Sequence, residues 1–228
     1  MAIDPCTEYG LALALEDFVP VILAGAGALA LARTCGLRHP RVAIPAFAGA
    51  VLVTAGGLGK ALWKTLVAAE PCRNVPLLEQ LLFPCLAFGF AALAWAVVSL
   101  RRDAVASPVP YVAAPLIGSV AAVLTGSMGP LLGVAALGAL WMGLNAATHA
   151  RLLGRHGVAG LFVAYLIGTL ILPPLAARPH QSEGLQWIEQ GVNSVVQLCF
   201  LIGSSALLRH AQTRSSSVSP STSAGALS

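Results

Sequence analysis

Seven apolar stretches separated by short breaks constrain the fold of this chain more than any other feature. A helix that crosses the hydrocarbon core of a membrane needs about 20 mostly apolar residues, and the stretches meet this length with a few residues of slack at their ends. They cover residues 11–32, 42–69, 77–100, 109–124, 131–148, 158–176 and 185–208. The fourth is the weakest, since it is the shortest and contains Pro110 and Pro115.

The composition excludes a soluble globular domain. Of the 228 residues, 57% are hydrophobic and 10% are charged, with a mean hydropathy of +0.81, whereas soluble domains carry about 25% charged residues. Lipid must therefore solvate most of the chain. We expect an all-α, polytopic membrane protein with seven transmembrane helices and the bilayer as its main partner. The basic residues form no clustered face of the kind that binds nucleic acid, so no such partner is expected.

The arginines indicate the orientation. With the N-terminus outside, nine arginines fall on the cytoplasmic side, and only Arg73 and Arg178 fall outside, which matches the usual cytoplasmic excess of basic residues. The nine are Arg33, Arg38, Arg41, Arg101, Arg102, Arg151, Arg155, Arg209 and Arg214. Eleven arginines against two lysines, with many Ala and Gly, are typical of a GC-rich bacterial genome. We therefore expect the plasma membrane of a bacterium, its inner membrane.

We expect three regions along the chain. Residues 1–10 form an outer segment without the basic start of a signal peptide, residues 11–210 form the transmembrane domain, and residues 211–228 form a disordered cytoplasmic tail. Cys6 and Cys72 both fall on the outer side, so either a disulfide joins them or both are free. Cys85 and Cys199 lie inside helices, where cysteine acts as a small apolar side chain.

Two segments start and end alike, which indicates an internal repeat. Glu79 precedes Arg101 by 22 residues in the third segment, and Glu189 precedes Arg209 by 20 in the seventh. Segments 1 to 3 and 5 to 7 would then be parallel repeats in a 3+1+3 arrangement, with the fourth as the inverting linker. Alternatively, any helix running inward starts with an acid and ends with arginine, because the helix dipole and the membrane favour both.

In topology alone, this arrangement is similar to that of sugar and vitamin facilitators and of opsins. None of their sequence motifs is present, and segment 185–208 lacks the lysine that binds retinal in an opsin. The chain also has no phosphate-binding loop, H-E-x-x-H, G-x-S-x-G or haem attachment motif, and no cysteine spacing suited to zinc. We therefore expect no cofactor and no metal. The sequence argues against an enzyme without excluding one, since paired carboxylates can act as acid and base.

Charged residues of four predicted helices lie at similar depth. Counting 1.5 Å per residue from the inner arginine of each helix places Glu16, Lys60, Glu79 and Glu189 about 26 to 33 Å away, and Asp17 joins them. This depth is the outer lip of the hydrocarbon core, where a charge is costly and indicates function or a partner. We expect Lys60 to contact one of the four acids, and Lys64, one turn nearer the surface, to extend into water.

The seventh segment continues this polar layer into the membrane. Asn193 and Gln197 follow Glu189 at i+4 and i+8, so the three residues share one helix face. Lipid cannot satisfy amides, so the stripe must face other helices or water. One interpretation is an outer vestibule in which Glu16, Glu79 and Glu189 attract a cation. The other is that the acids are first-turn residues and that Lys60 joins helices.

The leading functional hypothesis is a facilitator, either a transporter or a channel, for a small solute or ion, a cationic one included. Its candidate site residues are Glu16, Asp17, Lys60, Glu79, Glu189, Asn193 and Gln197. The alternatives are a non-catalytic accessory subunit, held by a membrane-protein partner or a second copy of the chain, and a membrane sensor.

The arginine asymmetry generates a topology prediction. A reporter inserted at residues 35–41, or fused after Arg214, should be cytoplasmic, and one inserted at residues 71–76 should be outside. Finding both ends of the chain on the same side would contradict seven crossings.

Overall fold

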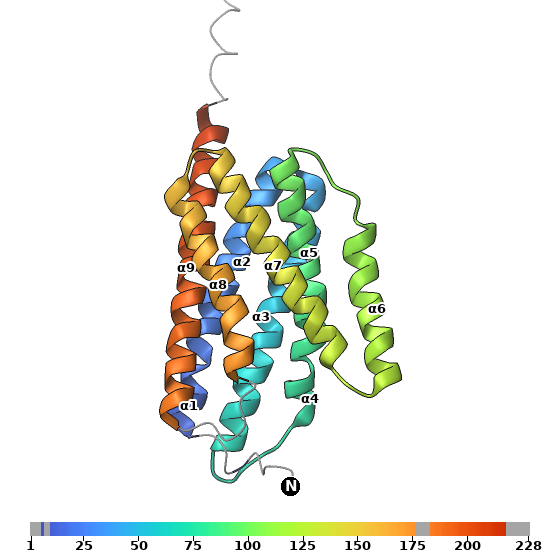
Figure 1. The fold of residues 1–228 in the computed structure, drawn as a ribbon, viewed down its shortest axis with the longest axis vertical. Helices are drawn as coiled ribbons and strands as arrows, with labels where there is room; N and C mark the ends of the chain where they lie inside the picture. The colour runs from blue at the N-terminus through green and yellow to red at the C-terminus, as the bar shows by residue number, and fades with distance from the viewer. Residues whose placement is uncertain (1–5, 7–9, 177–182, 218–228) are drawn as a thin grey trace, which may run out of the picture.

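The computed structural model describes residues 6, 10–176 and 183–217, and within these ranges every regular element is a helix (Figure 1). All seven predicted stretches are helical. The helices are α1 (Leu11–Glu16), α2 (Phe18–Arg38), α3 (Pro40–Ala68), α4 (Pro76–Gln80), α5 (Leu82–Arg102), α6 (Val109–Thr125), α7 (Gly129–Leu152), α8 (His156–Ala176) and α9 (Glu183–Ser217). Arg178 lies outside the described residues.

Five helical stretches among the described residues are long and apolar enough to cross a membrane. They are Leu11–Arg38, Pro40–Ala68, Pro76–Arg102, Gly129–Leu152 and Gly184–Arg214. Two shorter apolar helices, Val109–Thr125 and His156–Leu172, accompany them. The chain is therefore all-helical in its described parts, and its long apolar helices suit a protein embedded in a membrane.

Prolines, which the sequence indicates as kinks or hinges, explain where two of the predicted stretches are interrupted. Proline has no backbone N–H, so it cannot donate to the carbonyl four residues earlier. For Pro20 that carbonyl belongs to Glu16, the last residue of α1, and for Pro84 it belongs to Gln80, the last residue of α4. The first and third stretches are consequently divided into α1 with α2 and α4 with α5, close to their polar residues.

Six helices close a ring. Neighbours pack in the order α2, α3, α5, α7, α8 and α9, and α9 packs back against α2 (Figure 1). Helix α6 stands outside this ring against α5 and α7. This order is compatible with a repeat that pairs α2 with α7, α3 with α8 and α5 with α9. Each contact then has a counterpart: α2–α3 corresponds to α7–α8, α3–α5 to α8–α9, and α5–α7 to α9–α2.

The two ends of the bundle differ in charge, and we name them by their basic residues. The lysine end contains Lys60, Lys64 and the breaks at α1 and α4, at the bottom of Figure 1. The arginine end contains Arg38 and the connection from α5 to α6, at the top. At this end α9 continues through Ser217. The prediction of a disordered tail is therefore wrong for residues 211–217, where the helix simply extends past the apolar stretch, and residues 218–228 lie outside the described part.

Close backbone contact joins α3 to α5. A Cβ atom added to Gly89 would lie 2.9 Å from the carbonyl oxygen of Gly49 and 3.0 Å from the amide nitrogen of Val53. Neither atom can move without displacing a helix, so these two helices approach so closely because residue 89 has no side chain. Small residues commonly serve this purpose between membrane helices.

Gly89→Ala should therefore destabilise the protein by about 1 to 3 kcal/mol, the usual cost of overpacking. The measurement is unfolding of the purified protein by titration with a denaturing detergent. Gly133→Ala in α7 is the matched control, since no atom lies within 4 Å of the added Cβ. Equal stability of the two variants would show that the α3–α5 contact does not depend on this glycine.

Candidate functional site

Lys60 forms an ion pair with Glu79 at the lysine end. Its Nζ lies 2.6 Å from Oε1 of Glu79 and 4.3 Å from the ring centre of Trp63. The contact joins α3 to α4, so the prediction that Lys60 meets one of the four acids is confirmed. The neighbouring aromatic face adds to the stabilisation of the ammonium group.

A second lysine pairs with Asp17, and this partner was not predicted. The Nζ atom of Lys64 lies 2.6 Å from Oδ2 of Asp17, and the two side chains are only 15% and 10% exposed. Gln190 of α9 donates a hydrogen bond to the other oxygen of Asp17. Lys64 therefore does not extend into water as expected, because a carboxylate is within reach inside the bundle.

The remaining two predicted acids have different surroundings. Ser194 of α9 donates to Oε1 of Glu16 at 2.8 Å, while Oε2 of Glu16 is buried without a hydrogen-bond partner among the described residues. Glu189 is half-buried on α9, one residue before Gln190, and does not line the cavity described below. The two lysines pair with Glu79 and Asp17, so the layer joins α3 to α4 and to the α1–α2 junction, and α9 attaches to it through Gln190 and Ser194.

Covalent and polar contacts hold the loops of this end in place. Cys6 and Cys72 form a disulfide with a Cα–Cα distance of 5.8 Å, which is the first of the two predicted alternatives. Nε1 of Trp63 donates to Oδ1 of Asn74 at 2.9 Å. The disulfide at Cys72 and the hydrogen bond at Asn74 therefore fix the connection between α3 and α4, which leads to Glu79.

A cavity of about 280 Å³ lies within the ring, below the ion pairs. All six ring helices line it, and α6 does not. The lining residues are Pro20, Val21, Ala24, Val53, Gly57, Leu82, Leu86, Phe90, Leu132, Ala135, Ala136, Ala139, Tyr165, Thr169, Leu172, Asn193 and Gln197. Of the predicted site residues, only Asn193 and Gln197 reach it. These two residues of the predicted stripe face the cavity between the helices, whereas Glu189, its first residue, does not line it.

The charged layer sits one helical turn from the cavity. Four of its residues are each three positions from a lining residue, a rise of about 4.5 Å along a helix. The pairs are Asp17 with Pro20, Lys60 with Gly57, Glu79 with Leu82, and Gln190 with Asn193. The ion pairs therefore lie near the cavity, on its lysine-end side.

Toward the arginine end, side chains fill the ring. The core there includes Leu31, Leu93, Met142, Phe162 and Phe200, all nearly or fully buried. The ring of Phe200 lies 6.2 Å from that of Phe162 and 4.9 Å from that of Tyr165, which also lines the cavity. Of these three aromatic side chains only Tyr165 lines the cavity, and it joins the cavity wall to the packed core of the arginine half.

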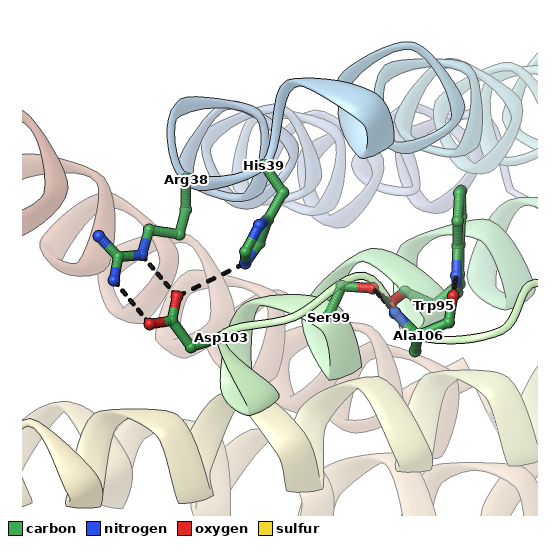
Figure 2. Close-up of polar contacts among 6 residues, drawn as sticks. All are labelled: Arg38, His39, Trp95, Ser99, Asp103 and Ala106. Atoms are coloured by element: carbon green, nitrogen blue, oxygen red, sulfur yellow. Dashed lines mark hydrogen bonds and ion pairs between the residues drawn. The ribbon is translucent and has the colours of Figure 1, made fainter.

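An exposed ion pair lies at the arginine end (Figure 2). Arg38 donates two hydrogen bonds to Asp103, of 2.7 and 2.8 Å, and Nε2 of His39 lies 3.7 Å from the same carboxylate. Arg38 lowers the pKa of Asp103 below its usual range, so the contact is present above about pH 4, the ordinary aspartate pKa, and is lost as the pH falls through the lower folded-state value. The contact joins the end of α2 to the end of α5.

The loop that follows Asp103 folds back onto α5. Nε1 of Trp95 donates to the carbonyl of Ala106 at 2.8 Å, and the amide of Ala106 donates to Oγ of Ser99 at 3.1 Å (Figure 2). The start of the connection to α6 is thereby fixed at the arginine end.

No cluster of three or more His, Cys, Asp or Glu side chains that could hold a metal occurs in the ranges that the structure describes. Comparison of the chain with protein-family models, with curated proteins and with solved structures finds no match. The function must therefore be argued from the cavity and its surroundings.

The burial of Lys64 and Asp17 generates a stability prediction. Lys64→Met should destabilise the protein by about 3 kcal/mol, because it leaves a buried carboxylate without its counter-charge. Adding Asp17→Asn, which keeps an oxygen that can accept from Gln190, should recover most of the loss. The exposed Arg73 provides the control Arg73→Met, which should change little. Detergent unfolding measures all four proteins, and a double variant no more stable than Lys64→Met would contradict the pairing.

Proposed function

We propose that this chain is an integral membrane protein with seven crossings that facilitates passage of a small solute across the plasma membrane of a bacterium. For the crossing number, support comes from the outward faces of the two shorter helices. On α6, Ile117 and Val123 are 68% and 82% exposed, and on α8 the exposed residues include Ile167 and Leu170. Faces this apolar suit lipid. The excess of arginine at one end supports placing that end in the cytoplasm.

The observation that carries the transport proposal is the cavity to which all six ring helices contribute lining residues. Ligand sites in membrane transporters lie between helices near the middle of the bilayer, and this cavity combines apolar walls with the amides of Asn193 and Gln197. The lysine-end ion pairs lie near one end of it, and the packed core of the arginine half lies toward the other. In this proposal, the conformation is one in which the solute enters from the lysine end.

Passage then requires two movements. Separation of the pairs Lys60–Glu79 and Lys64–Asp17 admits the solute. Rearrangement of the buried aromatic side chains of Phe162, Tyr165 and Phe200 then releases it toward the arginine end. The breaks beside Pro20 and Pro84 place flexible joints next to the acids of these pairs, since each leaves a carbonyl without its helical hydrogen bond. In this movement the side chains in the arginine half change their packing as the helices shift, and the order of the six helices around the ring is kept.

The same packed half favours a second candidate, a membrane sensor. A cavity that opens at one end only could bind a solute and transmit the change through the helices to a cytoplasmic partner. The two functions differ in whether the cavity ever reaches the other side of the membrane. An accessory subunit, the remaining alternative, would need no solute in the cavity at all.

A thiol placed in the cavity distinguishes these functions. Cys35, Cys85 and Cys199 are first replaced by Ala, keeping the disulfide, and Ala136→Cys is added as the probe. A membrane-impermeant maleimide should label this cysteine from both faces, in right-side-out and in inside-out vesicles. Val97→Cys, buried in the arginine half, is the control that should stay unlabelled. Labelling of residue 136 from one face only would favour the sensor and contradict the facilitator.

A further inference from the structure

The wall of the cavity has no formal charge. Aliphatic and aromatic side chains form most of it, and the polar side chains belong to Tyr165, Thr169, Asn193 and Gln197. The hydroxyl of Thr169 donates to the carbonyl of Tyr165 at 2.9 Å, within its own helix. The amides of α9, beside the hydroxyl of Tyr165, are therefore the hydrogen-bonding groups that face a ligand.

Both lysines near the cavity are paired with acids, while Glu16 accepts a hydrogen bond from Ser194 and does not line the wall. Lys60 and Lys64 are each 2.6 Å from a carboxylate oxygen of Glu79 and Asp17. A charged ligand entering the apolar part would lose its hydration and find no counter-charge on the wall, which is strongly unfavourable. This argues against the cationic solute that the acidic residues indicated in the sequence.

The two amides present a complementary pair of groups. Nε2 of Gln197 donates to Oδ1 of Asn193 at 3.3 Å. Within the described ranges, Oε1 of Gln197 and Nδ2 of Asn193 make no hydrogen bond, so one acceptor and one donor remain side by side. Exchanging the O and N positions of both amides still leaves one of each. A ligand group that both donates and accepts, such as a primary amide, would satisfy both.

The volume of the cavity limits the size of the ligand. A cavity of about 150 Å³ with apolar walls binds benzene, so about 280 Å³ suits a molecule on the order of ten non-hydrogen atoms. We propose that the cavity binds an uncharged small molecule with an apolar body and one amide-like group, which Asn193 and Gln197 recognise. This inference rests on the proposed function, because the cavity is its solute site.

Three probes of nearly equal size and shape test the proposal: benzamide, which is neutral, benzoate, an anion, and benzamidinium, a cation. Binding to the full-length protein in lipid nanodiscs is measured by calorimetry, with subtraction of binding to empty nanodiscs. Benzamide should bind at least about tenfold more tightly than either ion, as expected for an apolar site without a counter-charge. Asn193→Leu should weaken benzamide binding by about tenfold, because the ligand amide is left unpaired.

A matched pair of variants shows whether the cavity is the binding site. Ala136→Phe fills the cavity and should abolish benzamide binding, whereas Leu137→Phe, next to it on the outward face of α7 and 69% exposed before substitution, should not. Detergent unfolding establishes that both variants fold. Should Ala136→Phe fail to fold, Ala139→Leu is used in its place, with the same expected loss.

The outcomes separate this inference from the proposed function. Tighter binding of either ion, equal binding of all three probes, or no benzamide binding above empty nanodiscs would overturn the neutral ligand class. Selective benzamide binding together with labelling of residue 136 from one face only would support the ligand class and contradict transport. Preferred binding of an ion together with labelling of residue 136 from both faces would support transport and contradict the neutral ligand class.

Discussion

Charge pairing between helices is the interaction on which the polar end of this bundle depends. In an apolar environment an isolated ammonium or carboxylate is unstable, whereas a close pair with further hydrogen bonds is tolerated. Lys60 with Glu79 and Lys64 with Asp17 meet this condition, and Gln190 adds a hydrogen bond to Asp17. Because the partners are on different helices, the pairs also fix the position of α3 relative to α4 and to the α1–α2 junction.

This pairing gives the cavity its chemical character. The two lysines pair with Glu79 and Asp17 near one end of the cavity, and the cavity itself is lined by uncharged groups that include the amides of Asn193 and Gln197. Close packing in the arginine half, with Phe200 beside Phe162 and Tyr165, closes the other side. A cavity with ion pairs near one end, uncharged walls and a packed aromatic core toward the other end follows from the distribution of these few residues.

Much of the fold could be predicted from hydropathy, since apolar length determines where helices lie in a membrane protein. All seven stretches are helical, and counting residues along straight helices was sufficient to place Lys60 with Glu79 in one layer. Pro20 and Pro84 indicate kinks in the sequence, but the exact positions of the breaks after Glu16 and Gln80 were missed, although the carbonyls that these prolines leave unpaired determine them. The extension of α9 to Ser217 was also missed, because polar residues can continue a helix that packing has started.

The candidate site was less predictable, because the depth of a residue in the membrane does not specify which neighbouring helix its side chain faces. The sequence placed Glu189 with the other acids, yet the lysines pair with Glu79 and Asp17, and only the rotation of each helix decides this. The same applies to Lys64, whose burial depends on the position of α1. The cavity could not be predicted, since it is formed where small residues of six helices, such as Gly57 and Ala136, happen to face one another.

An experimental structure in lipid, at a resolution that shows water, tests the central claim most directly, namely that the cavity is a mostly apolar, uncharged solute site in which two amides bind the solute. The account predicts ordered water or solute hydrogen-bonded to the amides of Asn193 and Gln197, beneath intact Lys60–Glu79 and Lys64–Asp17 pairs. A cavity filled by a lipid acyl chain, with both amides turned away from it, would contradict the account.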